Sequence, residues 1–132
     1  MWLVTTFGYF SIVQKNSDKA EGTLTIRARV RGDMETLKQR YMPRMGEIDD
    51  SSGADYPYRV KARRVDVAKA FAQAILDMKY SNMKAEIAAQ QGPERERICS
   101  EVWMQLRRFQ ELDPAARSRT RQTQAVSGIE KP

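Results

Sequence analysis

Residues 23–31 read TLTIRARVR, and this stretch decides the fold class. Its apolar and polar side chains alternate without a break: Leu24, Ile26, Ala28 and Val30 fall on one side, and Thr25, Arg27, Arg29 and Arg31 on the other. A period of two is that of a β-strand, whose successive side chains point to opposite faces of the sheet. The stretch therefore predicts a strand with one covered apolar face and one cationic face.

Two further stretches predict strands beside it. Residues 56–63, YPYRVKAR, alternate in the same way, and Pro57 lacks an N–H group, so it belongs at the start of a strand or on a sheet edge. Residues 2–14, WLVTTFGYFSIVQ, are rich in β-branched and aromatic residues, which favour a pleated surface. We expect residues 2–14 and 23–31 to pair as an antiparallel hairpin across a polar turn.

Apolar residues at helical spacing follow the predicted strands at residues 23–31 and 56–63. Asp33 and Asp66 each stand just before an amphipathic pattern, Asn82 stands before a short helix, and Pro93 begins the last one. That last helix is predicted to bury one stripe of side chains: Ile98, Val102, Leu106 and Phe109.

The order of these elements predicts an α+β fold: a three-stranded, mainly antiparallel sheet packed under about four helices. The order β-β-α-β-α-α-α is partly ferredoxin-like but lacks a final strand. Residues 1–112 are expected to form a single domain. Residues 113–132 carry arginines but no periodic apolar residues, so a disordered basic tail is expected there.

The composition of the chain limits which kinds of catalytic and metal site are expected. The chain of 132 residues has 23 Lys and Arg against 17 Asp and Glu, a net charge of +6, no histidine, and Cys99 as its single cysteine. Without histidine the usual general base, triad partner and zinc ligand are missing, so we expect a protein that is not an enzyme, with no metal and no cofactor. The acidic residues between 47 and 55 lack the spacing of a calcium loop. No signal peptide or membrane-spanning stretch is found, which predicts a cytoplasmic protein without a membrane partner.

The two alternating strands are expected to place six cations on one sheet face. They are Arg27, Arg29, Arg31, Arg59, Lys61 and Arg63. Like charges on neighbouring strands repel, so this face would suit an acidic partner whose phosphates or carboxylates the arginines bind. Phe7 or Tyr9, if they share the face, could stack a nucleic-acid base. The alternative is a solvated face that prevents aggregation, with its charge neutralised by acids from loops.

Two other segments of the sequence carry residues of the kinds found in sites. Tyr80, Ser81 and Asn82 could form a small polar site, or simply begin a helix with a capping side chain. Cys99, with no histidine to activate it, is expected to be an inert core thiol.

Several motifs together carry a resemblance. They are WLVTTFG and SIVQK near the start, then TLTIRARVR, DYPYRV, YSNMKAE and QGPER. As a set, over residues 1–108, they resemble an uncharacterised family of small bacterial proteins. The resemblance implies a bacterial, plasmid or phage origin and carries over no activity, ligand or site residue.

Three functions follow as expectations. The first is a small non-catalytic binding protein whose basic sheet face engages a polyanion, either nucleic acid or a nucleotide. The alternative is a protein–protein effector of a phage or other mobile element, such as an inhibitor of a host defence complex. The third is a carboxylate-dependent enzyme acting on nucleotides.

Overall fold

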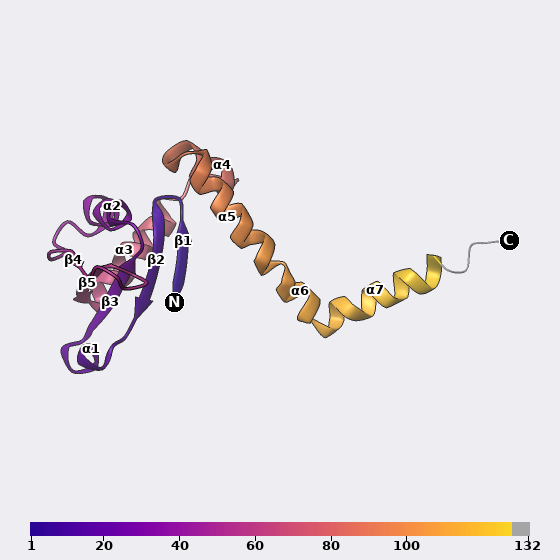
Figure 1. Ribbon diagram of the computed structural model, residues 1–132, viewed down its shortest axis with the longest axis horizontal. Coiled ribbons are helices and arrows are strands. Elements are labelled where there is room, and N and C mark those ends of the chain that lie inside the picture. The colour runs from indigo at the N-terminus through magenta and orange to yellow at the C-terminus, as the bar shows by residue number, and fades with distance from the viewer. Residues whose placement is uncertain (128–132) are drawn as a thin grey trace.

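The computed structural model describes residues 1–127, and its centre is one antiparallel sheet of five strands. They are β1 (Trp2–Thr5), β2 (Gly8–Val13), β3 (Thr23–Ala28), β4 (Asp49–Asp50) and β5 (Tyr58–Arg63). In space their order is β1-β2-β3-β5-β4 (Figure 1). The expected antiparallel pairing of the first two long strands is confirmed as β2 with β3, in a register that places Ile12 opposite Ile26.

Helices cover one face of the sheet and continue beyond it. They are α1 (Asn16–Glu21), α2 (Arg31–Tyr41), α3 (Arg64–Leu76), α4 (Met83–Gln91), α5 (Pro93–Leu106), α6 (Arg108–Leu112) and α7 (Pro114–Ser127). The α+β class is confirmed, but the expected three strands and about four helices were too few for the described part of the chain.

The core lies between the sheet and helices α2 and α3. The sheet contributes Phe10, Ile26, Ala28 and Val60, and the helices contribute Met34, Leu37, Val67 and Ala70. These are the apolar positions of the alternating strands, so the alternation of residues 23–28 and 58–63 correctly assigned the covered face. In the part of the chain that the structure describes, no helix covers most of the other face of the sheet, and we call it the open face.

The first strand region is a hairpin rather than one strand. Residues Thr5 and Gly8 face each other at its tip, so the apolar residues of both parities belong to two strands that reverse direction. A side chain at position 8 would collide with helix α2, because a Cβ atom there would lie 2.8 Å from the Cβ and Cγ atoms of Asp33. Glycine is therefore required at this position.

Asp33 is used differently from the helix cap expected of it. Helix α2 begins two residues earlier, so Asp33 lies within the first turn, with its side chain buried. Its carboxylate accepts the backbone N–H of Tyr9 at 3.0 Å and both Nη atoms of Arg95, at 2.8 and 2.9 Å. One acid thus joins α2, β2 and α5.

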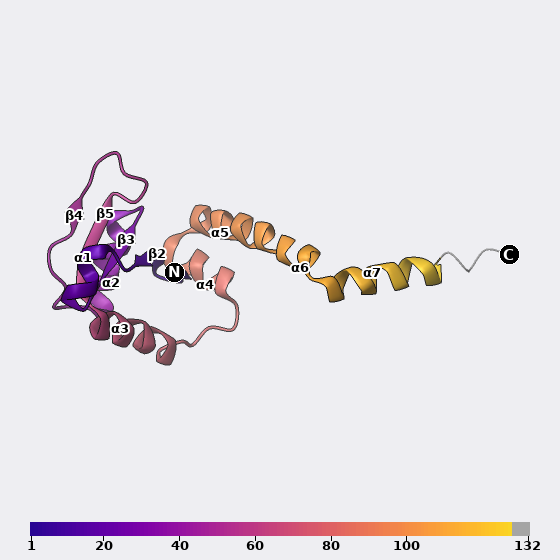
Figure 2. The ribbon, with the colours of Figure 1, turned by 90° about the horizontal axis from the view of Figure 1, so that it is seen from below.

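Helices α5, α6 and α7 form an arm that extends away from the sheet (Figures 1 and 2). The stripe predicted to be buried is uncovered: Ile98, Val102, Leu106 and Phe109 are between 42% and 67% exposed. That prediction was wrong because helical spacing identifies an apolar face but not a neighbour to cover it. The expected disordered tail is helical as far as residue 127, and residues 128–132 lie outside the described part.

Candidate polyanion-binding surfaces

Four of the six predicted cations lie together on the open face. The pairing of β3 with β5 places Arg27 directly opposite Arg59 and Thr25 opposite Lys61, and Arg63 lies at the end of β5. The side chains alternate as predicted, so Arg27, Arg59 and Lys61 point away from the helices that cover the core. The expected cationic row exists over these two strands.

The remaining two cations are not part of that row. Strand β3 ends at Ala28, so Arg29 follows the strand, where its Nη1 donates to the carbonyl oxygen of Asp55 at 2.8 Å. Arg31 is the first residue of helix α2 and pairs with Glu35 at 3.1 Å. The strand was expected to continue to residue 31, but Val30 is instead the cap of α2.

Most of the cations on the open face form ion pairs with acidic residues from loops and helices. Arg59 lies 3.9 Å from Asp55, Lys61 lies 3.1 Å from Glu21, and Arg63 is held by Asp66 at 2.8 Å. Asp49 also lies opposite Arg59 across the edge of the sheet. The open face is therefore close to electrically balanced, as the alternative interpretation of the alternating cations had it.

Lys61 also approaches a buried carboxylate. Asp18 is a residue of the short helix α1; its side chain is fully buried and accepts hydrogen bonds from the hydroxyls of Thr23 and Thr25 and from the backbone N–H of Lys15. Burial alone would raise the pKa of Asp18, but these hydrogen bonds, with Lys61 at 3.8 Å, outweigh it and lower the pKa below its ordinary value. Asp18 is a structural acid that holds α1 to β3.

Aromatic rings occupy the end of the open face near Arg27. The guanidinium of Arg27 lies 4.7 Å from the ring centroid of Tyr56, and that of Arg29 lies 4.4 Å from it. The hydroxyls of Tyr9 and Tyr56 are 3.1 Å apart, and desolvation together with this hydrogen bond raises the pKa of Tyr9 to about 12. Tyr56 is itself buried, so cation–π contacts of this kind fix the two arginines rather than leave them mobile.

The two aromatics proposed for base stacking lie in different places. Phe7 is buried in the core against Phe10, Tyr41 and Phe71, so its ring does not lie on the open face. Tyr9 lies on the open face and is partly exposed.

The Tyr80-Ser81-Asn82 segment begins helix α4. The side chain of Asn82 accepts the backbone N–H of Ala85, which is the capping role weighed for it. Tyr80 lines a groove of about 730 Å³ that also includes Phe7, Ile75 and Met78.

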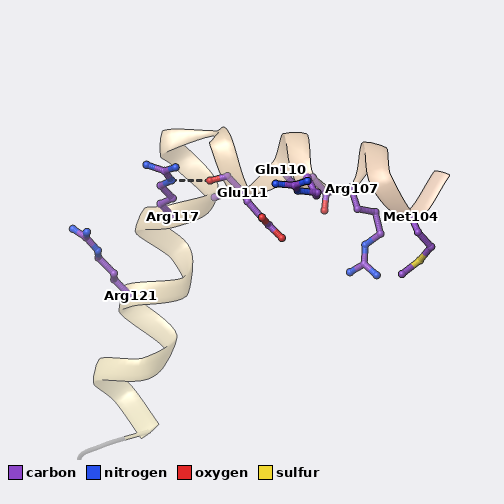
Figure 3. Close-up of a pocket in the computed structure, with 8 residues that line it drawn as sticks. Met104, Arg107, Gln110, Glu111, Arg117 and Arg121 are labelled. Atoms are coloured by element: carbon purple, nitrogen blue, oxygen red, sulfur yellow. Dashed lines mark hydrogen bonds between the residues drawn. The ribbon is translucent and has the colours of Figure 1, made fainter. Parts of the chain in front are cut away.

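A second group of cations lies on the arm; sequence reasoning expected Arg117 and Arg121 to add only charge, from a disordered tail, and did not join them to Arg107 and Arg108. Four arginines line an open concavity of about 690 Å³ where α6 meets α7: Arg107, Arg108, Arg117 and Arg121. Glu111 is the one acid among the lining residues (Figure 3). Arg117 and Arg121 are one helical turn apart, and the Nε of Arg117 donates to the carbonyl oxygen of Glu111 at 2.7 Å. We call these four residues the arm arginines.

The arm arginines differ from the open face in their balance of charge. Within residues 1–127 their guanidinium groups take part in no ion pair, whereas Arg59, Lys61 and Arg63 each have an acidic partner. A signal was present, because Arg117 and Arg121 are spaced for one helix face. It was passed over because the segment lacks the apolar periodicity that marks a packed helix.

Other chemistry is limited in the described residues. No group of three or more Cys, Asp or Glu side chains there is placed to hold a metal ion. Cys99 is partly buried, and desolvation raises the pKa of its thiol. No helix in the described part of the chain is both long enough and apolar enough to cross a membrane.

Comparison with known proteins adds no relative: no family model, no curated protein and no solved structure matches this chain.

Proposed function

We propose that the protein is a small, non-catalytic binding protein that engages a polyanion, a nucleic acid or nucleotide, through its phosphates. The observation that carries the proposal is the group of arm arginines, four guanidinium groups around one concavity with a single carboxylate among them. Arginine binds phosphate oxygens with two parallel N–H donors and stays charged at all physiological pH values.

The arm is a better candidate than the open face on electrostatic grounds. A phosphate at the open face would have to displace carboxylates that already neutralise Arg59, Lys61 and Arg63. At the arm arginines it would compete only with Glu111 and water. Arg119 adds a further positive charge to α7. The net charge of +6 brings a polyanion toward the molecule from a distance.

The test is fluorescence anisotropy with labelled single- and double-stranded DNA and RNA at low and physiological salt. The variant Arg107→Gln/Arg117→Gln/Arg121→Gln removes three cations and keeps good helix formers. The matched control, Arg29→Gln/Arg59→Gln/Arg63→Gln, removes the same charge from the other surface. We expect salt-sensitive binding by the wild type and a slope of log affinity against log salt that is shallower by about 2 to 3 in the arm variant.

Two results would contradict the proposal. If the wild type binds no nucleic acid at low salt, the polyanion function is excluded. If the control variant loses as much affinity as the arm variant, or more, the arm arginines are not the site. Circular dichroism on both variants checks that the fold is retained.

A protein partner is the second candidate function, and it is favoured by the open face. Trp2 is 73% exposed there, in the same cross-strand row as Ser11, Arg27 and Arg59. Trp and Arg beside a nearly balanced surface are typical of protein interfaces rather than of phosphate sites. An effector of this kind would form a stoichiometric complex with one protein, weakened by Trp2→Ala, and would bind no free nucleic acid.

A further inference from the structure

We propose that the apolar stripe of the arm is a homodimer interface, in which the arms of two copies of this chain pack antiparallel along Ile98, Val102, Gln105, Phe109 and Leu112. These five residues are called the seam. This inference rests on other residues than polyanion binding does, with one exception: Arg107 lies on the opposite side of the helix, Arg117 and Arg121 lie beyond the seam on α7, and Arg108 alone flanks the seam.

The seam has the spacing of a helix-pairing stripe. Its residues follow one another at steps of four, three, four and three, as the core positions of a coiled coil do. The step across Arg107 keeps this phase because that residue has helical backbone angles, φ −56° and ψ −26°. Its four apolar members are between 42% and 67% exposed. A helix with such a face in water is only marginally stable by itself.

The domain's own packing leaves the seam open. Helix α4 packs on a neighbouring side of α5, where Cys99 is partly buried and the ammonium of Lys84 lies 4.5 Å from the ring centroid of Trp103. The centre of the seam is about a third of a turn away from that side, by the 3.6-residue period. The arm itself extends clear of the sheet, so a second arm can lie along it (Figure 2).

Charge complementarity identifies the occupant as a second copy. In an antiparallel pair Ile98 packs against Phe109 of the second copy, and Val102 against its Gln105. The seam's flank then brings Glu101 opposite Arg108 of the second copy, and the two-fold axis repeats this contact. Among residues 1–127 neither Glu101 nor Arg108 has an ion-pair partner within the chain. In a parallel pair these two residues would not meet.

Two matched substitutions test the apolar contact. Phe109→Lys places a charge in the seam, whereas Met104→Lys makes the same kind of change at an exposed position on the other side of the helix. By analytical ultracentrifugation, we expect the wild type and Met104→Lys to reach twice the 15.2 kDa of one chain. Phe109→Lys should stay monomeric at concentrations up to about 200 µM.

A charge exchange tests the antiparallel arrangement. Glu101→Arg and Arg108→Glu should each weaken the dimer by about tenfold, because each replaces two attractive contacts by repulsive ones. The double variant Glu101→Arg/Arg108→Glu should recover the wild-type dissociation constant. The parallel arrangement predicts no recovery.

Three outcomes would overturn the proposal. A wild type that stays monomeric over this range would mean that a different protein or a lipid surface covers the seam. Equal loss of the dimer in Met104→Lys and Phe109→Lys would place the interface elsewhere. Failure of the double variant to recover would exclude the antiparallel pair. Nucleic-acid binding by Phe109→Lys, measured in parallel, separates this result from the polyanion proposal.

Discussion

At the scale of single residues, two buried acids hold the fold, and each is satisfied in a different way. Asp18 receives hydroxyl and backbone donors from its own neighbourhood, while Asp33 receives a guanidinium from a helix more than sixty positions away. A buried carboxylate is tolerated only when such donors surround it, because the cost of its desolvation is several kcal/mol. Asp18 therefore contributes to stability in its charged form.

Asp18 makes that contribution dependent on pH. Its folded-state pKa lies below the ordinary value of 3.8, so its stabilisation is fully present above that value and is lost as the pH falls through the folded-state pKa. We expect Asp18→Asn to lower the free energy of unfolding at neutral pH by about 3 kcal/mol, because the amide cannot accept all of the donors.

Urea denaturation between neutral and acidic pH measures this. The difference in free energy of unfolding between the wild type and Asp18→Asn should become smaller in acid. The control is Asp66→Asn, which removes an exposed acid paired with Arg63. A difference between wild type and Asp18→Asn that stays constant in acid would contradict the assignment.

At the scale of elements, two side chains attach the root of the arm to the α+β domain, one to the turn between β1 and β2 and one to helix α2. The amide of Gln91 donates to the carbonyl oxygen of Thr6 at 2.5 Å, and Arg95 binds Asp33 with both Nη atoms. Lysine could keep the charge of Arg95 but not the paired geometry of its fork. The attachment of α5 thus depends on one specific guanidinium.

We expect Arg95→Lys to lower the free energy of unfolding by about 1 to 3 kcal/mol, since the buried carboxylate of Asp33 loses a charged donor. Arg97→Lys, two positions further along the same helix and exposed, should change it by less than about 0.5 kcal/mol. Chemical denaturation measures the free energy of unfolding of both variants. Equal losses would mean that the two N–H donors of the Arg95 guanidinium are not required.

The elements differ in how far they could be predicted. The alternation of residues 23–28 and 58–63 was enough to assign the strands and their covered face, because burial on one side imposes that period. Neutralisation of the cations by loop acids was one of the expected alternatives, and Asp55 fits it, but the pairing of Lys61 with Glu21 joins segments forty residues apart and could not be predicted. Strand β4 has only two residues, too few for any pattern.

The helices show the same division. Asn82 and Pro93 were correctly placed at helix starts, because capping and a missing N–H group are local effects. Asp33 was given a local role but serves a distant one, in contact with Arg95. Arg117 and Arg121 were expected in a disordered tail because α7 has no apolar stripe to signal a helix.

At the scale of the whole molecule, a packed α+β domain carries an arm whose stability has a different source. The sheet strands share a common core, whereas α6 and α7 lie away from it (Figure 1). The helices α6 and α7 should therefore unfold locally while the sheet stays folded.

Native-state hydrogen exchange tests this difference. In dilute solution the amides of β2 and β3 should exchange at least about a thousandfold more slowly than those of α7, and amides of α5 beside the seam should slow further as protein concentration rises. Equal protection of α7 and β3 would contradict the separation into two parts, and Met104→Lys should behave as the wild type.

The junction at Gly92, with φ 91° and ψ 165°, gives the arm the mechanics of a lever. Residues 93–112 extend about 30 Å at 1.5 Å per residue, so a rotation of about 10° at the junction moves the far end by about 5 Å. A change of a fraction of an ångström among Gln91, Arg95 and Asp33 would thus be magnified at the arm arginines. The distance between the arm arginines and the sheet is therefore set by the backbone at Gly92, far from the arginines themselves.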